Sequence, residues 1–489
     1  MLSDNEILKL ILGFKIRHLR QKHSIPYQEL SRQTGLSVSY LNDIEKGKKY
    51  PKPDKIRALA TAFEVDYDEL VGIKSDKKLL PVIDLLNSGF FKHFPADEFG
   101  FNTEKLIDFF SNAPDRISAF ISTILKITRS YHIEKEHFYR IALRSYQDMH
   151  DNFFPELESV AEEFRSANKI KTDQIIPLDT LRSLVGQLNI TIDTSSLAKN
   201  KKLNGFRSYF NPDNRVLYLN SGLSEEQERF LLSKEIGFEL LMIKERAYET
   251  VLEKEASFEK LLNNFKASYF SAALLMPAAA ITNDIKKMAL ATTWKGQLVQ
   301  GLLTKYQVTP ETLIQRFTNI LPRFFNISNL FFIRLDGASD KNMINYRITK
   351  ELHLSGLHKP YPNQLAEHLC HRWVSISSIK SVVNSSKSHF IDAQISKYWE
   401  TDNAYFCISI AQKKRFDQKA GGSITLGLAM NETLKGTFNF IKDPDLKTRQ
   451  VNTTCERCSM PDCDNRVAPA TYVEKKRREE ELEEALKTL

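Results

Sequence analysis

Glycine and proline residues near the start of the chain divide it into helices that are too short to be stable alone. Pro26 can open a helix that ends at Gly35, because proline suits the first position of a helix and glycine suits the position after its last turn. Ser37 is a suitable N-cap for the next helix, which ends at Gly47. The expected short helices cover residues 26–35, 38–46, about 53–64 and about 67–71. Together with an amphipathic helix over residues 7–24, they predict a small all-helical domain in which the helices stabilise one another.

Two of these helices, joined by a glycine turn and followed by lysines, are typical of a helix-turn-helix. The stretch YQELSRQTGLSVSYLNDIEKGKKYPKPDKIRALATAF, residues 27–63, resembles the phage-repressor-like (XRE-type) helix-turn-helix family. The resemblance implies binding to double-stranded DNA and a structural ion pair between Arg20 and Glu45. It puts Ser37, Val38, Ser39 and Asn42 at base edges, and Tyr27, Gln28, Lys46, Lys48 and Lys49 at phosphates. A helical protein-docking module is the alternative to DNA binding.

Length and composition limit what the rest of the chain can be. A chain of 489 residues exceeds one ordinary hydrophobic core, so several domains are expected. The hydrophobic content of 42% and the charged content of 27% are typical of a globular protein. No apolar stretch could span a bilayer, and the first residues do not resemble a signal peptide, so we expect a cytosolic protein without membrane segments, whose thiols stay reduced. The net charge of +8 is compatible with a polyanionic partner.

Two kinds of pattern follow the N-terminal domain. Residues 74–170 have helical spacing throughout, and we interpret them as a connector that carries dimer contacts. Beyond about residue 175, strands enter the pattern. The expected elements are a helix and then a strand over 178–194, a hairpin over 206–223 with its turn at 212–214, and helices over 224–243 and 261–281. Ser224 and Gln227 form a capping box at the start of the first of these two helices.

This order of elements resembles the zinc metallopeptidase-like domains that follow helix-turn-helix units in phage-type regulators. In those enzymes the first helix carries H-E-x-x-H, whose two histidines hold zinc while the glutamate lies beside the zinc-bound water. Here the aligned stretch is KEIGF, so Lys234 and Phe238 replace the histidines and only Glu235 remains. The third ligand, an acidic residue before SYFSAALLMP, is also missing, because Asn264 and Lys266 occupy that region. We therefore expect a retained fold without peptidase activity.

Longer motifs extend a resemblance over residues 8–472. They are YFNPDNRVLYLNSGLSEEQERFLLSKEIGFELL, NFKASYFSAALLMP, LFFIRLD, LCHRWVSI and CERCSMPDCDNRVAPA, in this order. The series resembles the short-chain fatty acyl-CoA regulators, transcription factors of propionate, acetate and glyoxylate-cycle metabolism. It implies an acyl-CoA site with an apolar slot and basic groups for the phosphates. The ligand-binding candidates are Arg215, Tyr269, Arg334 and Lys341. For Tyr269 the alternative is ordinary core packing, and for the three basic residues it is a solvated surface charge.

The cysteines gather near the end of the chain. Residues 326–450 look rich in strands, at NLFFIRLD, HRWVSISSI, HFIDAQIS, NAYFCISIAQK and GSITLGLAM. Three of the five cysteines then follow in CERCSMPDC. With the cysteine before HRW they give four candidate metal ligands, namely Cys370, Cys455, Cys458 and Cys463. Four thiolates suit zinc or an iron–sulfur cluster equally by count. Three clustered cysteines and one distant cysteine favour a [4Fe–4S] cluster, which the resemblance also implies; zinc and no metal stay open. Cys407 is expected to be a buried core thiol.

Together these patterns predict a multidomain chain, with an all-α helix-turn-helix N-terminus and helical connector before an α+β sensor that has a strand-rich C-terminal part. The expected parts are the helix-turn-helix domain (1–73), the connector (74–170), a degenerate metallopeptidase-like ligand-binding domain (171–325), a strand-rich domain with the cysteine cluster (326–472) and a charged, solvated helix (473–489). The predicted function is a cytosolic, homodimeric transcription factor that binds operator DNA and responds to acyl-CoA. The alternatives are a phage-type or toxin–antitoxin regulator that acts through protein partners, and a zinc metallopeptidase that cleaves a repressor, which KEIGF disfavours.

Overall fold

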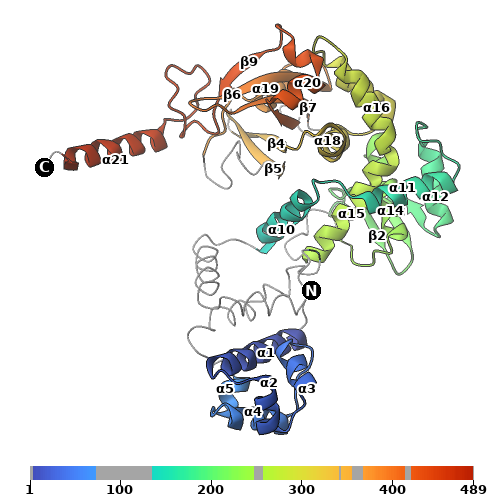
Figure 1. Ribbon diagram of the computed structural model, residues 1–489. Helices are drawn as coiled ribbons and strands as arrows, with labels where there is room; N and C mark the ends of the chain where they lie inside the picture. Colours follow the sequence, from blue (N-terminus) through green and yellow to red (C-terminus); the bar gives the residue numbers. More distant parts are fainter. Residues whose placement is uncertain are drawn as a thin grey trace. The chain divides into compact units, whose positions relative to one another are not determined.

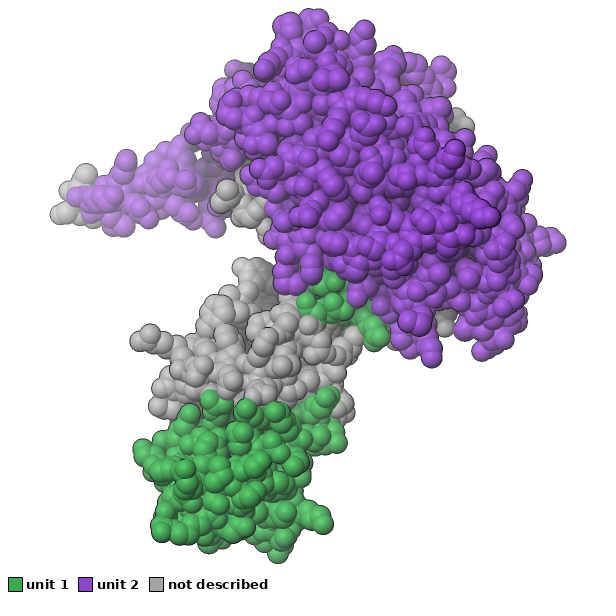
Figure 2. Space-filling view, turned by 45° about the vertical axis from the view of Figure 1, so that its right-hand side comes forward, with its two compact units in different colours: residues 1–146, 252–262 green, residues 147–251, 263–489 purple. Residues whose placement is uncertain are grey.

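The computed structural model describes residues 4–72, 98, 135–246, 257–340, 343–354, 367–413 and 420–487 (Figure 1). The chain divides into two compact units (Figure 2). Unit 1 contains Met1–Tyr146 and Leu252–Leu262, and unit 2 contains Gln147–Val251 and Asn263–Leu489. Most of the expected connector, residues 74–170, lies outside the described residues, apart from two helices at its end.

The N-terminal part of unit 1 is the expected five-helix domain. Its helices are α1 (Asp4–Lys22), α2 (Tyr27–Thr34), α3 (Val38–Glu45), α4 (Pro53–Ala62) and α5 (Tyr67–Val71). The Ser37 hydroxyl accepts a hydrogen bond from the Tyr40 amide at 3.2 Å, which confirms the predicted N-cap. Gly35 and Gly47 have φ angles of 69° and 65°, a region that favours glycine.

One buried core joins these helices. Its members come from α1 to α5 and are Leu12, Ile16, Leu30, Leu41, Ile44, Ile56, Leu59, Ala60, Phe63 and Leu70. The helices α1 and α3 approach closely at Gly13, where a Cβ atom would lie 2.4 Å from the carbonyl oxygen of Ile44. A side chain at this position would therefore force the two helices apart.

Unit 2 begins with a mainly helical region around a small sheet. The helices are α10 (Lys135–Met149, which begins in unit 1), α11 (Pro155–Ala167), α12 (Leu178–Gln187), α13 (Ser196–Lys199), α14 (Glu225–Leu240), α15 (Phe258–Leu275, which also begins in unit 1), α16 (Ala278–Ala289), α17 (Gln297–Tyr306) and α18 (Pro310–Phe325). The strands β1 (Thr191–Asp193), β2 (Ser208–Asn211) and β3 (Val216–Leu219) form a sheet in the order β1-β3-β2. β3 is parallel to β1 and antiparallel to β2.

Local sequence signals in this region are confirmed. The predicted helix and strand at 178–194 correspond to α12 and β1, and the predicted hairpin corresponds to β2 and β3. Ser224 and Gln227 make both hydrogen bonds of the capping box at the start of α14. The helix expected over 261–281 is interrupted, because α15 ends at Leu275 and Pro277 then caps α16. Proline cannot continue the hydrogen bonding of the preceding helix, which explains the break.

A buried ion pair holds three helices of this region together. Arg316 on α18 donates to both carboxylate oxygens of Glu158 on α11, at 2.5 and 2.8 Å. The Tyr269 hydroxyl on α15 donates to the same carboxylate at 2.7 Å. Arg316 is fully buried, so the pairing with Glu158 must compensate for the cost of removing its charge from water.

The C-terminal part of unit 2 is built on one large sheet. Its strands are β4 (Leu330–Asp340), β5 (Met343–His353), β6 (His389–Tyr398), β7 (Ala404–Lys413), β8 (Gly421–Ala429) and β9 (Thr448–Val451), in the order β5-β4-β8-β7-β6-β9. All neighbours are antiparallel except β6 and β9. The helix α19 (Val374–Val383) packs against β6, β7 and β8, and α18 packs against β4 and β8 (Figure 1). α20 (Glu432–Thr437) and the short 3-10 helix η3 (Asn439–Lys442) follow β8.

The strand predicted at HRWVSISSI is wrong, because this segment forms α19. Its alternating apolar residues imitate the period of a strand. Ile376, Ile379 and Val383 are spaced as on one helix face, and Ile376 and Ile379 are buried in a cluster with residues of the sheet. Burial against the sheet therefore outweighs the local preference of β-branched residues for strands.

The charged end of the chain forms α21 (Thr471–Lys487), which has no buried residue and confirms the predicted solvated helix. Among the described helices, none combines the length and the apolar composition needed to cross a membrane.

Candidate functional site

The helix α3 presents the side chains that the sequence assigned to base edges. Ser37, Val38 and Ser39 are exposed and Asn42 is half-buried. Val38 is an exposed apolar side chain, with 40% of its surface accessible. An exposed apolar residue beside small hydroxyls suits contact with base edges and thymine methyl groups in a major groove.

The side chains predicted to bind phosphates differ in how exposed they are and in whether other residues already contact them. Gln28, Lys48 and Lys49 are exposed, and Lys46 is half-buried. Lys49 forms an ion pair with Asp43 at 3.0 Å. Tyr27 is half-buried, and its hydroxyl donates to a buried carboxylate, so its main contacts are structural.

The carboxylate that accepts from Tyr27 belongs to Glu45, and the predicted ion pair between Glu45 and Arg20 is confirmed. Arg20 donates to the two oxygens of Glu45 at 2.7 and 2.9 Å, and the Tyr27 hydroxyl donates at 2.7 Å. The guanidinium carbon of Arg20 lies 4.0 Å from the centre of the Tyr27 ring. Burial, together with the hydrogen bond to Glu45, raises the pKa of Tyr27 to about 12.

The positions aligned with zinc ligands come together, but they carry other chemistry. The Lys234 ammonium donates to the Asn264 side chain at 2.5 Å and lies 5.6 Å from the centre of the Phe238 ring. An ammonium, a phenyl ring and an amide provide no lone pair of the kind that zinc prefers. Glu235 is paired with Arg246, a residue that the sequence analysis did not single out.

The three candidate acyl-CoA residues that the structure describes lie in different parts of unit 2. Arg215 donates to Glu239 at 2.9 Å and to the carbonyl of Leu188 at 2.8 Å. Tyr269 is 4% exposed and belongs to the buried group that it forms with Glu158 and Arg316. Arg334 pairs with Glu311 at 3.2 Å. The fourth candidate, Lys341, lies outside the described residues.

Arg215, Tyr269 and Arg334 therefore make structural contacts in three different places. Arg215 lies at the end of the small sheet, Tyr269 in the helical core and Arg334 on the large sheet. Strand periodicity could locate a charge inside a strand, but it could not reveal the partner of that charge on another element.

The four cysteines expected to hold a metal, by contrast, line one pocket. Cys370, Cys455 and Cys458 are buried and Cys463 is half-buried. All four line the same pocket at the end of the large sheet, together with Arg372 and Arg466 among others. Cys370 is 85 residues from Cys455 in the sequence, since 455 − 370 = 85. The fold thus brings the distant cysteine to the three clustered ones.

Backbone pairing explains how they meet. Leu369 and Thr454 form an antiparallel β-bridge, and two backbone hydrogen bonds accompany it. The Cys370 amide donates to the carbonyl of Thr453 at 3.2 Å, and the Cys455 amide donates to the carbonyl of His368 at 2.9 Å. Arg466 then donates to carbonyls within the loop at 2.8 to 3.0 Å, namely those of Cys455, Cys458 and Met460. These contacts fix the loop around the pocket.

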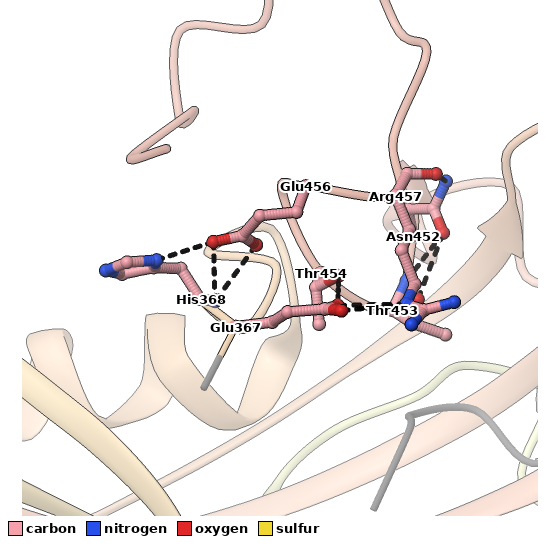
Figure 3. A network of polar contacts seen from close by, with 7 residues as sticks. All are labelled: Glu367, His368, Asn452, Thr453, Thr454, Glu456 and Arg457. Atoms are coloured by element: carbon pink, nitrogen blue, oxygen red, sulfur yellow. Dashed lines mark hydrogen bonds and ion pairs between the residues drawn. The ribbon is translucent and has the colours of Figure 1, made fainter. Parts of the chain in front are cut away.

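Two carboxylates, Glu367 and Glu456, join the cysteine loop to the segment before Cys370 (Figure 3). Glu367 accepts from the Thr454 hydroxyl at 2.6 Å and from Arg457 at 2.9 Å. Glu456 accepts from the backbone amide and ring of His368, at 3.0 and 2.7 Å. Each of the two segments thus supplies acceptors to the other, which resists separation of Cys370 from the loop.

Burial, with a smaller contribution from the nearby thiols of Cys455 and Cys458, raises the pKa of the Cys370 thiol to about 11. Backbone amides of Arg372 and Asn452 act in the opposite direction. A buried thiol with such a pKa is protonated at neutral pH, so a bound metal would have to displace the proton.

Four cysteines around one pocket are compatible with either kind of metal centre. One zinc ion binds all four sulfurs at about 2.3 Å, whereas a four-iron cluster binds each thiolate on a different iron. Within the part of the chain that the structure describes, no three Cys, His, Asp or Glu side chains form a group that could hold a metal ion.

A second pocket lies in the same region, between α19 and the large sheet. Phe331, Ile333, Trp373, Val374, Ser375, Ser396, Tyr398, Cys407 and Thr425 line it. Cys407 is 4% exposed, which confirms the predicted core thiol. The walls are mainly apolar with a few hydroxyl groups, and the cavity between them is about 10 Å³, room for about one water molecule.

Comparisons with known proteins agree with two parts of this description. The helix-turn-helix family model matches residues 16–70, and the model of the IrrE N-terminal-like domain matches residues 187–318. The first match covers most of the five-helix domain, with α2 and α3 as its central pair. The chain is a DNA-binding transcriptional regulator. The second match covers α14 and α15, which carry the positions aligned with zinc ligands.

No curated protein matches the chain. Among solved structures, a Mycobacterium tuberculosis transcriptional regulator matches with 15% identity and a TM-score of 0.47, over 67% of this chain and 93% of that one. A likeness at this level carries no argument about function.

Proposed function

We propose that this regulator carries a [4Fe–4S] cluster on Cys370, Cys455, Cys458 and Cys463 and responds to a short-chain acyl-CoA. The observation that carries the first part is the shared pocket of the four cysteines, which two distant segments form. Thiolates are the usual protein ligands of such clusters, and the number and spacing of these cysteines fit the group. When bound, the cluster would supply one-electron redox chemistry.

The surrounding residues suit such a group. Four thiolates add negative charge to a buried pocket, and Arg372 and Arg466 line the same pocket with positive charge. Arg466 also fixes the loop through its backbone carbonyls. Trp373 donates through its indole nitrogen to the carbonyl of Asn452 at 2.8 Å, so the wall of the second pocket is joined to the start of the cysteine loop. In our proposal this hydrogen bond is the route by which a change in one pocket reaches the other.

We propose that an acyl group enters between α19 and the sheet only when the packing there opens, because the cavity between them is about 10 Å³, the size of one water molecule. The acyl-CoA motifs of the sequence support this class of ligand, while the contacts of Arg215, Tyr269 and Arg334 argue against a site built on those residues. For regulation, the ligand must bind one arrangement of the protein better than another.

We further propose that the protein acts as a homodimer and has no peptidase activity. Helix-turn-helix regulators commonly place two recognition helices on two half-sites of the operator, which requires two copies. The replacement of both histidines by Lys234 and Phe238, and the hydrogen bond between Lys234 and Asn264, support the loss of zinc chemistry.

The deciding experiment is iron and sulfide analysis, with an absorption spectrum, on the anaerobically purified full chain. We expect brown protein with about four iron and four sulfide per chain. Cys455→Ser should lose both, whereas Cys407→Ser, a buried thiol that does not line the cysteine pocket, should keep them. Colourless protein that contains one zinc, or neither metal, would remove the cluster from the proposal.

A further inference from the structure

The helix α14 carries two carboxylates on one face. Glu235 and Glu239 are separated by one helical turn, which puts both side chains on the same side of α14. Glu235 is 4% exposed. A carboxylate so deeply buried is costly unless a positive charge and hydrogen bonds compensate for it. In the related zinc enzymes a metal ion would provide that charge.

Here the guanidinium of Arg246 provides it. One nitrogen of Arg246 donates to Glu235, and another donates to one oxygen of Glu239 at 2.6 Å, while the second oxygen of Glu239 accepts from Arg215 at 2.9 Å. The Arg246 side chain is 17% exposed. Its guanidinium carbon lies 4.1 Å from the centre of the Phe210 ring and 4.7 Å from the centre of the Phe238 ring. Two carboxylates and two ring faces together match a flat cation with donors along its edge.

An ammonium group would not match this site equally well. It is compact and strongly hydrated, and it lacks the flat fork of donors with which a guanidinium bonds two carboxylates while its plane stacks on rings. The ammonium of Lys234 lies near the same ring, but it donates to Asn264 instead. The site therefore prefers a guanidinium to an ammonium because of the difference in shape between the two cations.

We propose that the former zinc site of this domain has become a guanidinium-binding site, which the chain fills with its own Arg246. The site consists of Glu235, Glu239, Phe210 and Phe238. Phe238 replaces the second histidine of the peptidase motif and forms one wall, and Glu235 is the glutamate of that motif. Arg246 thereby fixes the residues that follow α14, and Asn263 on α15 supports them by donating to the carbonyl of Glu245 at 3.0 Å.

The test uses Arg246→Ala in the full chain and ethylguanidinium as the probe, at low millimolar concentrations that do not denature proteins. Thermal unfolding is followed by tryptophan fluorescence, because all three tryptophans lie in unit 2. We expect Arg246→Ala to melt several degrees below the wild type and ethylguanidinium to restore at least half of the loss. The wild type should not respond, since its site is filled. Ethylammonium at the same concentration should restore much less.

The double variant Arg246→Ala, Glu235→Gln provides the matched control, because it keeps the cavity but removes the central charge. It should lose the response to ethylguanidinium. If Arg246→Ala does not fold by itself, the refolded yield with ethylguanidinium against ethylammonium gives the same comparison. Equal effects of the two compounds on Arg246→Ala, no effect of either, or an undiminished response of the double variant would overturn the proposal.

Discussion

Removing Arg20 should destabilise the DNA-binding domain and leave the rest of the chain intact. Glu45 is 1% exposed and accepts two hydrogen bonds from Arg20 and one from Tyr27. Arg20→Met keeps most of the apolar contact but leaves the carboxylate with the tyrosine hydroxyl alone. Losing one partner of a buried pair costs about 3–5 kcal/mol. We expect the lower end, about 3 kcal/mol, because the Arg20 side chain is 15% exposed and water can enter.

The assay separates the two units by their signals. Trp294, Trp373 and Trp399 all lie in unit 2, so their fluorescence during urea unfolding reports on that unit. Circular dichroism at far-ultraviolet wavelengths reports on the helices of both units. For a small domain a loss of about 3 kcal/mol, with a slope of roughly 1.5 kcal/mol per molar urea, moves the transition by about 2 M. Part of the dichroism signal should move by this amount while the fluorescence transition stays in place.

Two controls complete the experiment. Arg20→Met together with Glu45→Met should recover most of the lost stability, because replacing both members of a buried pair is often neutral. Arg32→Met should leave the transition in place, since its pair with Glu29 is solvent-exposed. An unchanged dichroism transition in Arg20→Met, or a double variant no more stable than the single one, would refute the reasoning.

Three further variants test other parts of the protein. Lys48→Ala with Lys49→Ala should weaken binding to all DNA sequences and lower the slope of log affinity against log salt by up to about 2, as measured by fluorescence anisotropy; an unchanged slope would remove both lysines from the phosphate contacts. Arg316→Met should lower the unfolding free energy of unit 2 by about 3–5 kcal/mol, because a carboxylate on α11 stays buried without its partner; a small loss in tryptophan-detected urea unfolding would contradict this. The difference in melting temperature between the wild type and Arg246→Ala should become smaller as the pH falls toward 5. Burial raises the pKa of Glu235, Arg246 opposes the rise, and without the guanidinium the rise is larger. A carboxyl whose pKa is higher in the folded than in the unfolded chain contributes stability to the fold that grows as the pH falls and is lost as the pH rises. A decrease in melting temperature that does not depend on pH would therefore argue against the role of Glu235.

Local signals in the sequence were sufficient for much of the fold. The caps at Ser37 and Ser224 and the turn at Gly35 depend on a few adjacent residues, and the structure has each of them as predicted. The Arg20–Glu45 pair could be predicted because the helix-turn-helix resemblance fixes both positions. The expected domain boundaries stay predictions, since most of the connector lies outside the described residues.

The remaining errors concern contacts between distant segments. The apolar alternation at 371–379 indicated a strand, and only the packing of α19 on the sheet reveals a helix. The Tyr269 hydroxyl donates to Glu158, which is 111 residues away in the sequence, while its role in ligand binding stays a prediction. Arg246 could not be found from its neighbours, because its carboxylates lie on α14 and one of its rings lies on β2. A side chain's charge can be read from the sequence, whereas the identity of its partner depends on the tertiary fold.

The measurement that tests the regulatory account most directly is DNA affinity as a function of acyl-CoA. The full chain would first select its preferred duplex from a random pool, and its affinity for that duplex would then be titrated with propionyl-CoA and, as the control, free coenzyme A. We predict that propionyl-CoA changes the dissociation constant at least severalfold while coenzyme A has little effect, because in our proposal the acyl group binds between α19 and the sheet in only one arrangement of the protein. An affinity that propionyl-CoA, acetyl-CoA and coenzyme A all leave unchanged would contradict acyl-CoA sensing and favour a regulator that acts through protein partners.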